Sequence, residues 1–160
     1  MTGEYILQIV IAALLGGAIG LEREYRSKEA GFRTHFLVGL GSGLFMVLSL
    51  HGFDDFMGRP GIQRDPARLA AQVVSGIGFI GAGTIIFQKN VVKGLTTAAG
   101  LWVTSAIGMT AGAGMYAVSS VATVLVLLCL EGSNFIHHKI FHQKEEVEDF
   151  YDPNTKHKEE

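Results

Sequence analysis

The chain has 160 residues, of which 48% are hydrophobic and only 18% are charged, and its formal net charge is -2. A soluble domain usually carries about 25% charged residues, and a nucleic-acid-binding surface needs an excess of positive charge, so both classes are disfavoured. A lone cysteine, Cys129, excludes a disulfide framework within the chain. The composition instead predicts an all-α, polytopic membrane protein whose solvent is the lipid bilayer.

Five apolar stretches are long enough, or nearly so, to cross the roughly 30 Å of bilayer hydrocarbon as helices. The first stretch is preceded by Glu4 rather than by a basic flank, so we interpret it as a retained span and not as a signal peptide. We therefore expect a bundle of five transmembrane helices: Tyr5–Leu21, Thr34–Leu50, Pro66–Phe87, Leu95–Ala111 and Met115–Ile136.

The distribution of basic residues predicts the orientation of these spans. The loops after the first and third spans, together with the C-terminal tail, hold ten Lys and Arg residues, against three on the other side. Because cytosolic segments are rich in Lys and Arg, we expect the N-terminus outside and the C-terminus in the cytosol. Residues 1–142 then form the transmembrane domain, and residues 143–160 form a charged cytosolic tail that we expect to be disordered.

The chain contains 21 glycines, and several recur at the GxxxG spacing. In lipid there is little hydrophobic drive between helices, so small residues matter because they let helix backbones approach closely. We expect these glycines to pack the helices of one chain, or, for one of the pairs, to mediate dimer formation. We also expect a homodimer, because five slim helices bury little surface alone. The glycines concerned are Gly16, Gly20, Gly39, Gly43, Gly76, Gly78, Gly81 and Gly83.

The segment from Gly76 to Gly81 also fits the GxGxxG pattern of dinucleotide-binding sites. Such a site needs a strand before it and an acidic residue about 20 positions later, whereas here a helix start precedes it and the next acid is Glu131. The spans also hold no nucleophile–base pair and no acid–base pair of carboxylates. We therefore expect neither a cofactor nor an enzymatic activity.

His138 and His142 have the spacing of two metal ligands on one helical face, with His137 and Glu145 nearby. A zinc site needs further ligands in fixed positions, and none is evident, so a polar helix face at the membrane surface is the preferred interpretation. The sequence leaves the question of a bound metal open.

Polar residues cluster near the start of the third span. Arg68, Gln72 and Ser75 share one helical face, and Asp65 precedes Pro66 at a position typical of a helix N-cap. Polar side chains within a span usually face the bundle interior or a hydrated cavity. They either stabilise helix contacts or line a path for an ion or solute, and the second interpretation makes a small transporter or channel the alternative function.

The first cytosolic loop and its neighbours have simple structural explanations. Glu22 and Arg26, and likewise Glu24 and Lys28, have the i, i+4 spacing of helical ion pairs. Thr34 is a candidate cap for the second span, and Thr96 and Thr97 are candidate caps for the fourth.

Three segments, in this order, resemble the MgtC/SapB family of bacterial inner-membrane proteins: residues 20–38, 64–85 and 90–102. The resemblance implies five transmembrane helices with a periplasmic N-terminus. It also implies a link to growth in low magnesium, to virulence inside macrophages or to acid resistance. Members are expected to act without enzymatic activity, by binding other membrane proteins such as the F-type ATP synthase.

The family motifs fall on polar residues of all three segments. The positions carried over are Glu22, Arg23, Arg33, Thr34, His35, Asp65, Arg68, Gln72, Ser75, Thr96 and Thr97. Many relatives have Asn where this chain has Thr96. This chain therefore lacks any contact that the Asn side-chain amide makes in those relatives. Longer relatives carry a folded C-terminal cytosolic domain, so we expect this chain to be a short member. The partner, any bound ion and the physiological trigger stay open.

Overall fold

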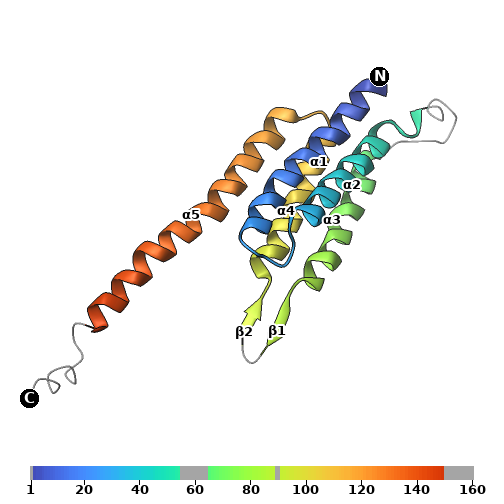
Figure 1. The fold of residues 1–160 in the computed structure, drawn as a ribbon. Helices are drawn as coiled ribbons and strands as arrows, with labels where there is room; N and C mark the ends of the chain where they lie inside the picture. The colour runs from blue at the N-terminus through green and yellow to red at the C-terminus, as the bar shows by residue number, and fades with distance from the viewer. Residues whose placement is uncertain (1, 55–64, 89–90, 150–160) are drawn as a thin grey trace, which may run out of the picture. The chain divides into compact units, whose positions relative to one another are not determined.

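The computed structural model describes residues 2–54, 65–88 and 91–149, and it describes side chains as far as residue 132. These residues form helices and one small hairpin, shown in Figure 1. The helices are α1 (Thr2–Tyr25), α2 (Phe32–His51), α3 (Pro66–Gly83), α4 (Leu95–Gly112) and α5 (Tyr116–Asp149), and the strands are β1 (Ile86–Gln88) and β2 (Val91–Lys93). The expected helical class is thus confirmed, and the hairpin is an addition to it.

The third predicted span is shorter than expected because α3 ends at Gly83 rather than at Phe87. The Thr84 hydroxyl donates a hydrogen bond to the Gly81 carbonyl oxygen at 2.8 Å, which closes the last turn. The chain then forms the antiparallel pair, in which Phe87 lies opposite Val92. Gly94 follows at φ +87°, and a Cβ there would overlap the Thr84 carbonyl oxygen, so this return to the bundle requires glycine.

Glycines bring α1, α2 and α4 into backbone contact. A Cβ placed on Gly16 would lie 2.5 Å from the His35 carbonyl oxygen, and one on Gly39 would lie 2.5 Å from that of Ala12. On α4, a Cβ on Gly108 would lie 2.5 Å from the Gly39 carbonyl oxygen. These three helices therefore approach closely enough that no side chain fits between them at these points.

Helix α3 lies beside α2 and α4 (Figure 1) and buries only Ile77 and Gly81. Gly81 approaches Ala98 of α4, since a Cβ there would lie 3.5 Å from the Ala98 carbonyl oxygen. In contrast, a Cβ on Gly76, Gly78 or Gly83 would meet no described atom within 4 Å. Most of the α3 glycines that we expected to pack helices therefore face open space in the described part of the chain.

The bundle buries polar side chains together with small and aliphatic ones, and it exposes many large apolar side chains. Large apolar side chains on α1, α2, α4 and α5 are at least 40% exposed, among them Leu14, Leu37, Trp102 and Val121. The buried polar residues are Gln8, Arg23, His35, Ser42, Ser49, Thr97, Thr104, Ser105, Ser119 and Thr123. A water-soluble protein shows the reverse distribution and rarely exposes large contiguous apolar surface.

Two of the helices, α1 and α2, are long and apolar enough to cross a membrane by length and composition. Residues 1–126 form one compact unit, and residues from 127 onward form a second one. Helix α5 begins in the first unit and runs to Asp149. It therefore continues past residue 142, the position at which the sequence predicts the end of the transmembrane domain.

Candidate functional site

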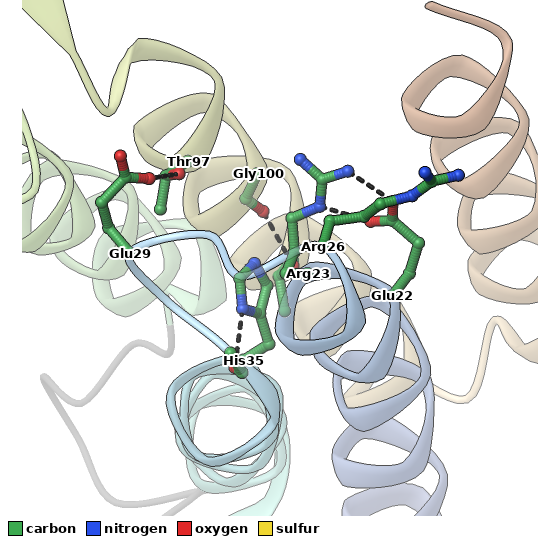
Figure 2. A network of polar contacts seen from close by, with 9 residues as sticks. Glu22, Arg23, Arg26, Glu29, His35, Thr97 and Gly100 are labelled. Atoms are coloured by element: carbon green, nitrogen blue, oxygen red, sulfur yellow. Dashed lines mark hydrogen bonds and ion pairs between the residues drawn. The ribbon is translucent and has the colours of Figure 1, made fainter. Parts of the chain in front are cut away.

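Two places in the first unit bring together polar residues singled out by the sequence. One is the polar cluster, in which the end of α1, the following loop and the starts of α2 and α4 meet (Figure 2). It consists of Glu22, Arg23, Arg26, Glu29, His35 and Thr97. The other is the α2–α3 groove, a cavity of about 640 Å³ that these two helices line together with Ser105 of α4.

Arg23 is buried in the polar cluster, with a side chain only 2% exposed. Its guanidinium donates two hydrogen bonds to the carboxylate of Glu22, from Nε to Oε2 and, at 2.6 Å, from Nη2 to Oε1. The expected pair of Glu22 with Arg26 also forms, with 3.9 Å between Oε1 and Nε. A bidentate carboxylate is the strongest partner that a buried guanidinium can have, so Glu22 neutralises the charge that α1 buries.

The start of α2 is capped from α1. The Glu24 carboxylate accepts a hydrogen bond from the backbone N–H of Phe32 at 2.8 Å. The cap position itself is Gly31, and Thr34 lies within the first turn, so the prediction that Thr34 caps this helix was wrong. The predicted pair of Glu24 with Lys28 is absent from the described contacts, because α1 ends at Tyr25 and Lys28 lies in the turn beyond it.

A long-range hydrogen bond joins the loop after α1 to α4. The hydroxyl of Thr97, which is buried, donates to Glu29 Oε2 at 2.6 Å (Figure 2). This bond is the main reason why the pKa of Glu29 lies below its ordinary value, with the Glu29 backbone N–H and the charges of Lys28 and Lys93 as further causes. Gly94 holds the cap position of α4, so neither Thr96 nor Thr97 caps that helix as expected.

His35 lies between the three closely packed helices and is fully buried. Its Nδ1 is 3.1 Å from the Gly31 carbonyl oxygen and therefore carries the proton of that hydrogen bond. Its Nε2 is buried without a hydrogen-bond partner among the described residues. The ring lies next to Gly100, where a Cβ would be 3.4 Å from Nε2, so a small residue on α4 makes room for it.

The α2–α3 groove has a polar end and a long apolar body. Arg33 and Thr34 line it at the start of α2, and Phe45 and Leu69 line it at the other end. Ser42 and Ser105, whose hydroxyls are 2.8 Å apart, hydrogen-bond to each other in its wall. The remaining lining residues are Leu37, Val38, Gly41, Gln72, Val73, Gly76, Ile77 and Ile80.

Of the polar residues predicted at the start of the third span, only Gln72 lines this groove. Asp65, Arg68 and Ser75 are exposed outside it. Asp65 does occupy the N-cap position of α3, but its side chain makes no capping hydrogen bond, and the described residues show no ion pair between it and Arg68. Gln72 thus lines the same groove as Arg33 and Thr34, towards its Leu69 end, and the structure does not assemble the four α3 residues into one path.

Sequence reasoning missed Glu24, Glu29, Ser42 and Ser105. Glu24 was predicted to pair with Lys28, and Glu29 was assigned no role, because their acceptor roles depend on where α2 and α4 lie. Ser42 shares a helix face with Gly39 and Gly43 by the i, i+3 and i, i+4 spacing, which indicates a small-residue face but not the hydrogen bond to Ser105.

Among the described residues, no group of three or more His, Cys, Asp or Glu side chains could hold a metal ion. The side chains of His137, His138, His142 and Glu145 lie outside the described part, so the metal hypothesis for them is untested.

Comparison with known proteins gives consistent matches. The model of the MgtC family matches residues 9–139. "Putative magnesium transporter YhiD" of Escherichia coli K12 is 50% identical over 143 residues, which cover 89% of this chain and 63% of that protein. "Protein MgtC" of Salmonella typhimurium LT2 is 42% identical over 123 residues, 77% of this chain and 49% of that protein.

A third relative, "Uncharacterized protein slr0014" of Synechocystis, is 36% identical over 146 residues, which cover 89% of this chain and 59% of that protein. The chain thus spans about half to two-thirds of the length of these curated relatives. No solved structure matches.

Proposed function

Since this chain belongs to the MgtC family, we propose that it is a non-enzymatic protein of the bacterial inner membrane that acts by binding other membrane proteins. Its N-terminus lies in the periplasm and its C-terminus in the cytosol. It serves adaptation to low magnesium, to acid or to life inside host cells, as the resemblance of its motifs implies.

The observation that carries this proposal is that polar side chains are buried while many large apolar side chains are exposed. Ser, Thr, His and Arg side chains are buried between α1, α2 and α4, whereas Leu, Val and Phe side chains cover the outside. In lipid, buried hydroxyls hydrogen-bond within the bundle and apolar side chains meet acyl chains. This arrangement suits a bundle surrounded by hydrocarbon on all sides.

The exposed side of α3 supports binding through a helix face. Gly78 and Gly83 leave room for another backbone, and Phe79 beside Gly78 is 85% exposed. Small residues on a membrane helix let a second helix backbone approach closely. The face fits a helix of another membrane protein, for which the F-type ATP synthase is a candidate, and it also fits α3 of a second copy.

Photo-crosslinking in living cells tests this proposal. A benzoylphenylalanine at position 79 is expected to form protein adducts in cells grown in low magnesium or at acid pH, and mass spectrometry of the adducts separates a second copy from a different protein. The matched control carries the same probe at Leu14, which is 60% exposed on α1. Equal adducts at both positions, or none at position 79, would contradict the proposal.

The alternative function is a small transporter or channel. The name of the Escherichia coli relative and the presence of Gln72, Arg33 and Thr34 in one groove favour it. Against it, the described lining of the groove contains no carboxylate, and cation paths in membranes normally use acidic side chains. Magnesium flux into proteoliposomes that is lost in Gln72→Ala would establish transport, and absence of flux in the unmodified protein would remove it.

A further inference from the structure

We propose that the α2–α3 groove binds one anionic phospholipid, with the headgroup at Arg33 and an acyl chain along the apolar body. The inference rests on the proposed membrane location of the chain, but not on the proposed protein partner. It is carried by the shape, the lining and the charge of the groove.

The dimensions of the groove match one leaflet. From Arg33 to Phe45, α2 rises about 18 Å at about 1.5 Å per residue, which is close to half of the roughly 30 Å of hydrocarbon that a bilayer contains. The volume of about 640 Å³ lies within the range of roughly 300–1,000 Å³ that small-molecule sites occupy. A ligand in the groove therefore reaches from the membrane surface to about the bilayer centre.

The lining selects an acyl chain rather than a polar solute. Below Thr34, the groove is bounded mainly by aliphatic and aromatic side chains, and Leu37, Phe45 and Ile80 remain about half exposed or more. The groove is thus open along its side, as entry of a lipid from the bilayer requires. The apolar body contains few polar groups. The hydroxyls of Ser42 and Ser105 hydrogen-bond to each other, and Gln72 contributes one amide.

Two glycines keep the groove open. Gly41 on α2 and Gly76 on α3 both line it, and a Cβ on either would meet no described atom within 4 Å. Gly16, Gly39 and Gly108, in contrast, make space for a neighbouring helix backbone, as Gly39 does for Ala12. At Gly41 and Gly76 the space is left unfilled by the described residues.

Charge selects an anionic headgroup. Arg33 is exposed at the polar end, and no described carboxylate pairs with it. The guanidinium favours bidentate hydrogen bonds to phosphate, and the Thr34 hydroxyl beside it is a further donor. A basic side chain at the cytosolic surface also meets the leaflet that is rich in anionic lipids.

Native mass spectrometry of the delipidated protein in detergent tests the proposal with phosphatidylglycerol and with phosphatidylcholine of the same acyl chains. The unmodified protein is expected to retain phosphatidylglycerol more tightly. Arg33→Gln should weaken phosphatidylglycerol binding about fivefold, the size expected for one basic side chain at an anionic lipid surface, and leave phosphatidylcholine unchanged. Arg68→Gln, at an exposed arginine outside the groove, is the charge control and should have no effect.

A matched pair of glycine variants tests the groove itself. Gly76→Leu fills it and should abolish the preferential binding, whereas Gly78→Leu, on the same helix and equally free of steric overlap, should not. Equal binding by Gly76→Leu and Gly78→Leu, or an Arg33→Gln variant that binds phosphatidylglycerol as the unmodified protein does, would overturn the proposal. Crosslinking from position 79 is independent of these results, so a failure of the lipid site is distinguishable from a failure of the proposed function.

Discussion

Arg23 is the largest side chain that the described part of the bundle buries completely, and its charge is matched by one carboxylate, that of Glu22. Replacing one partner of a buried ion pair leaves the other charge uncompensated. We therefore expect Glu22→Gln to lower the free energy of unfolding by about 3–5 kcal/mol, measured by denaturation in detergent micelles. Glu4→Gln, at an exposed glutamate near the N-terminus, should be neutral. A Glu22→Gln variant as stable as the unmodified protein would show that the pair does not stabilise the bundle.

The hydrogen bond from Thr97 to Glu29 predicts a pH dependence of stability. Because the pKa of Glu29 is lower in the folded protein, its contribution is present above about 4.3, the pKa of an unperturbed glutamate, and is lost as the pH falls through the folded value. Thr97→Val keeps the buried volume and removes the donor. It should therefore reduce the loss of stability between pH 6 and acid pH.

Thermal unfolding across this pH range measures the effect of Thr97→Val. Thr96→Val is the matched control, since Thr96 is exposed and does not bond Glu29. Identical pH profiles for Thr97→Val and the unmodified protein would show that the bond does not lower the pKa of Glu29.

Sequence reasoning named several residues of the polar cluster but predicted only one of their contacts, the pair of Glu22 with Arg26. Glu22 and Arg26 are four apart on one helix, so their pairing follows from helical geometry. Thr97 and Glu29 are 68 positions apart, and Phe32 and Glu24 belong to different helices. These contacts depend on how the helices pack, which local spacing does not contain.

At the scale of the elements, α1, α2 and α4 depend on glycines that touch a neighbouring backbone. Gly39 and Gly41 lie on the same helix, but only Gly39 faces another helix, with the Ala12 carbonyl oxygen 2.5 Å from the position of a Cβ. Gly39→Val should therefore cost at least about 1–3 kcal/mol, the usual range for overpacking. Gly41→Val should be near neutral, because a Cβ there meets no described atom.

Unfolding in detergent micelles, with helicity followed by circular dichroism, compares the two valine variants. Equal stabilities would contradict the contact between α1 and α2 at Gly39.

The helices could be predicted because each is a long apolar run ended by glycine or charged residues. The hairpin could not, since Ile85, Ile86 and Phe87 continue the apolar run of α3 without interruption. The Thr84 hydroxyl bonds the Gly81 carbonyl oxygen where the helix ends, and the left-handed Gly94 returns the chain from the hairpin to α4; a hydropathy pattern records neither feature. Likewise, the sequence predicts a helix-packing role for both Gly39 and Gly76. Only at Gly39, however, would an added Cβ meet a neighbouring helix backbone.

At the scale of the whole molecule, the distribution of basic residues predicts the orientation. We expect a green fluorescent protein fused to the C-terminus to fluoresce and an alkaline phosphatase fused there to be inactive. A phosphatase placed at the N-terminus, exported by its own signal sequence, should be active. The reverse pattern would show that Arg33 and the loop after α1 face the periplasm.

The central claim is that the apolar outside of the bundle is in contact with lipid. Spin labels at Leu14, Leu37 and Val121, introduced one at a time into a Cys129→Ser background and reconstituted in liposomes, report the solvent at these exposed positions. The account predicts frequent collisions with oxygen, which dissolves in the bilayer, and few with a water-soluble nickel reagent. Labels that collide mainly with the nickel reagent would place these faces in water and contradict it.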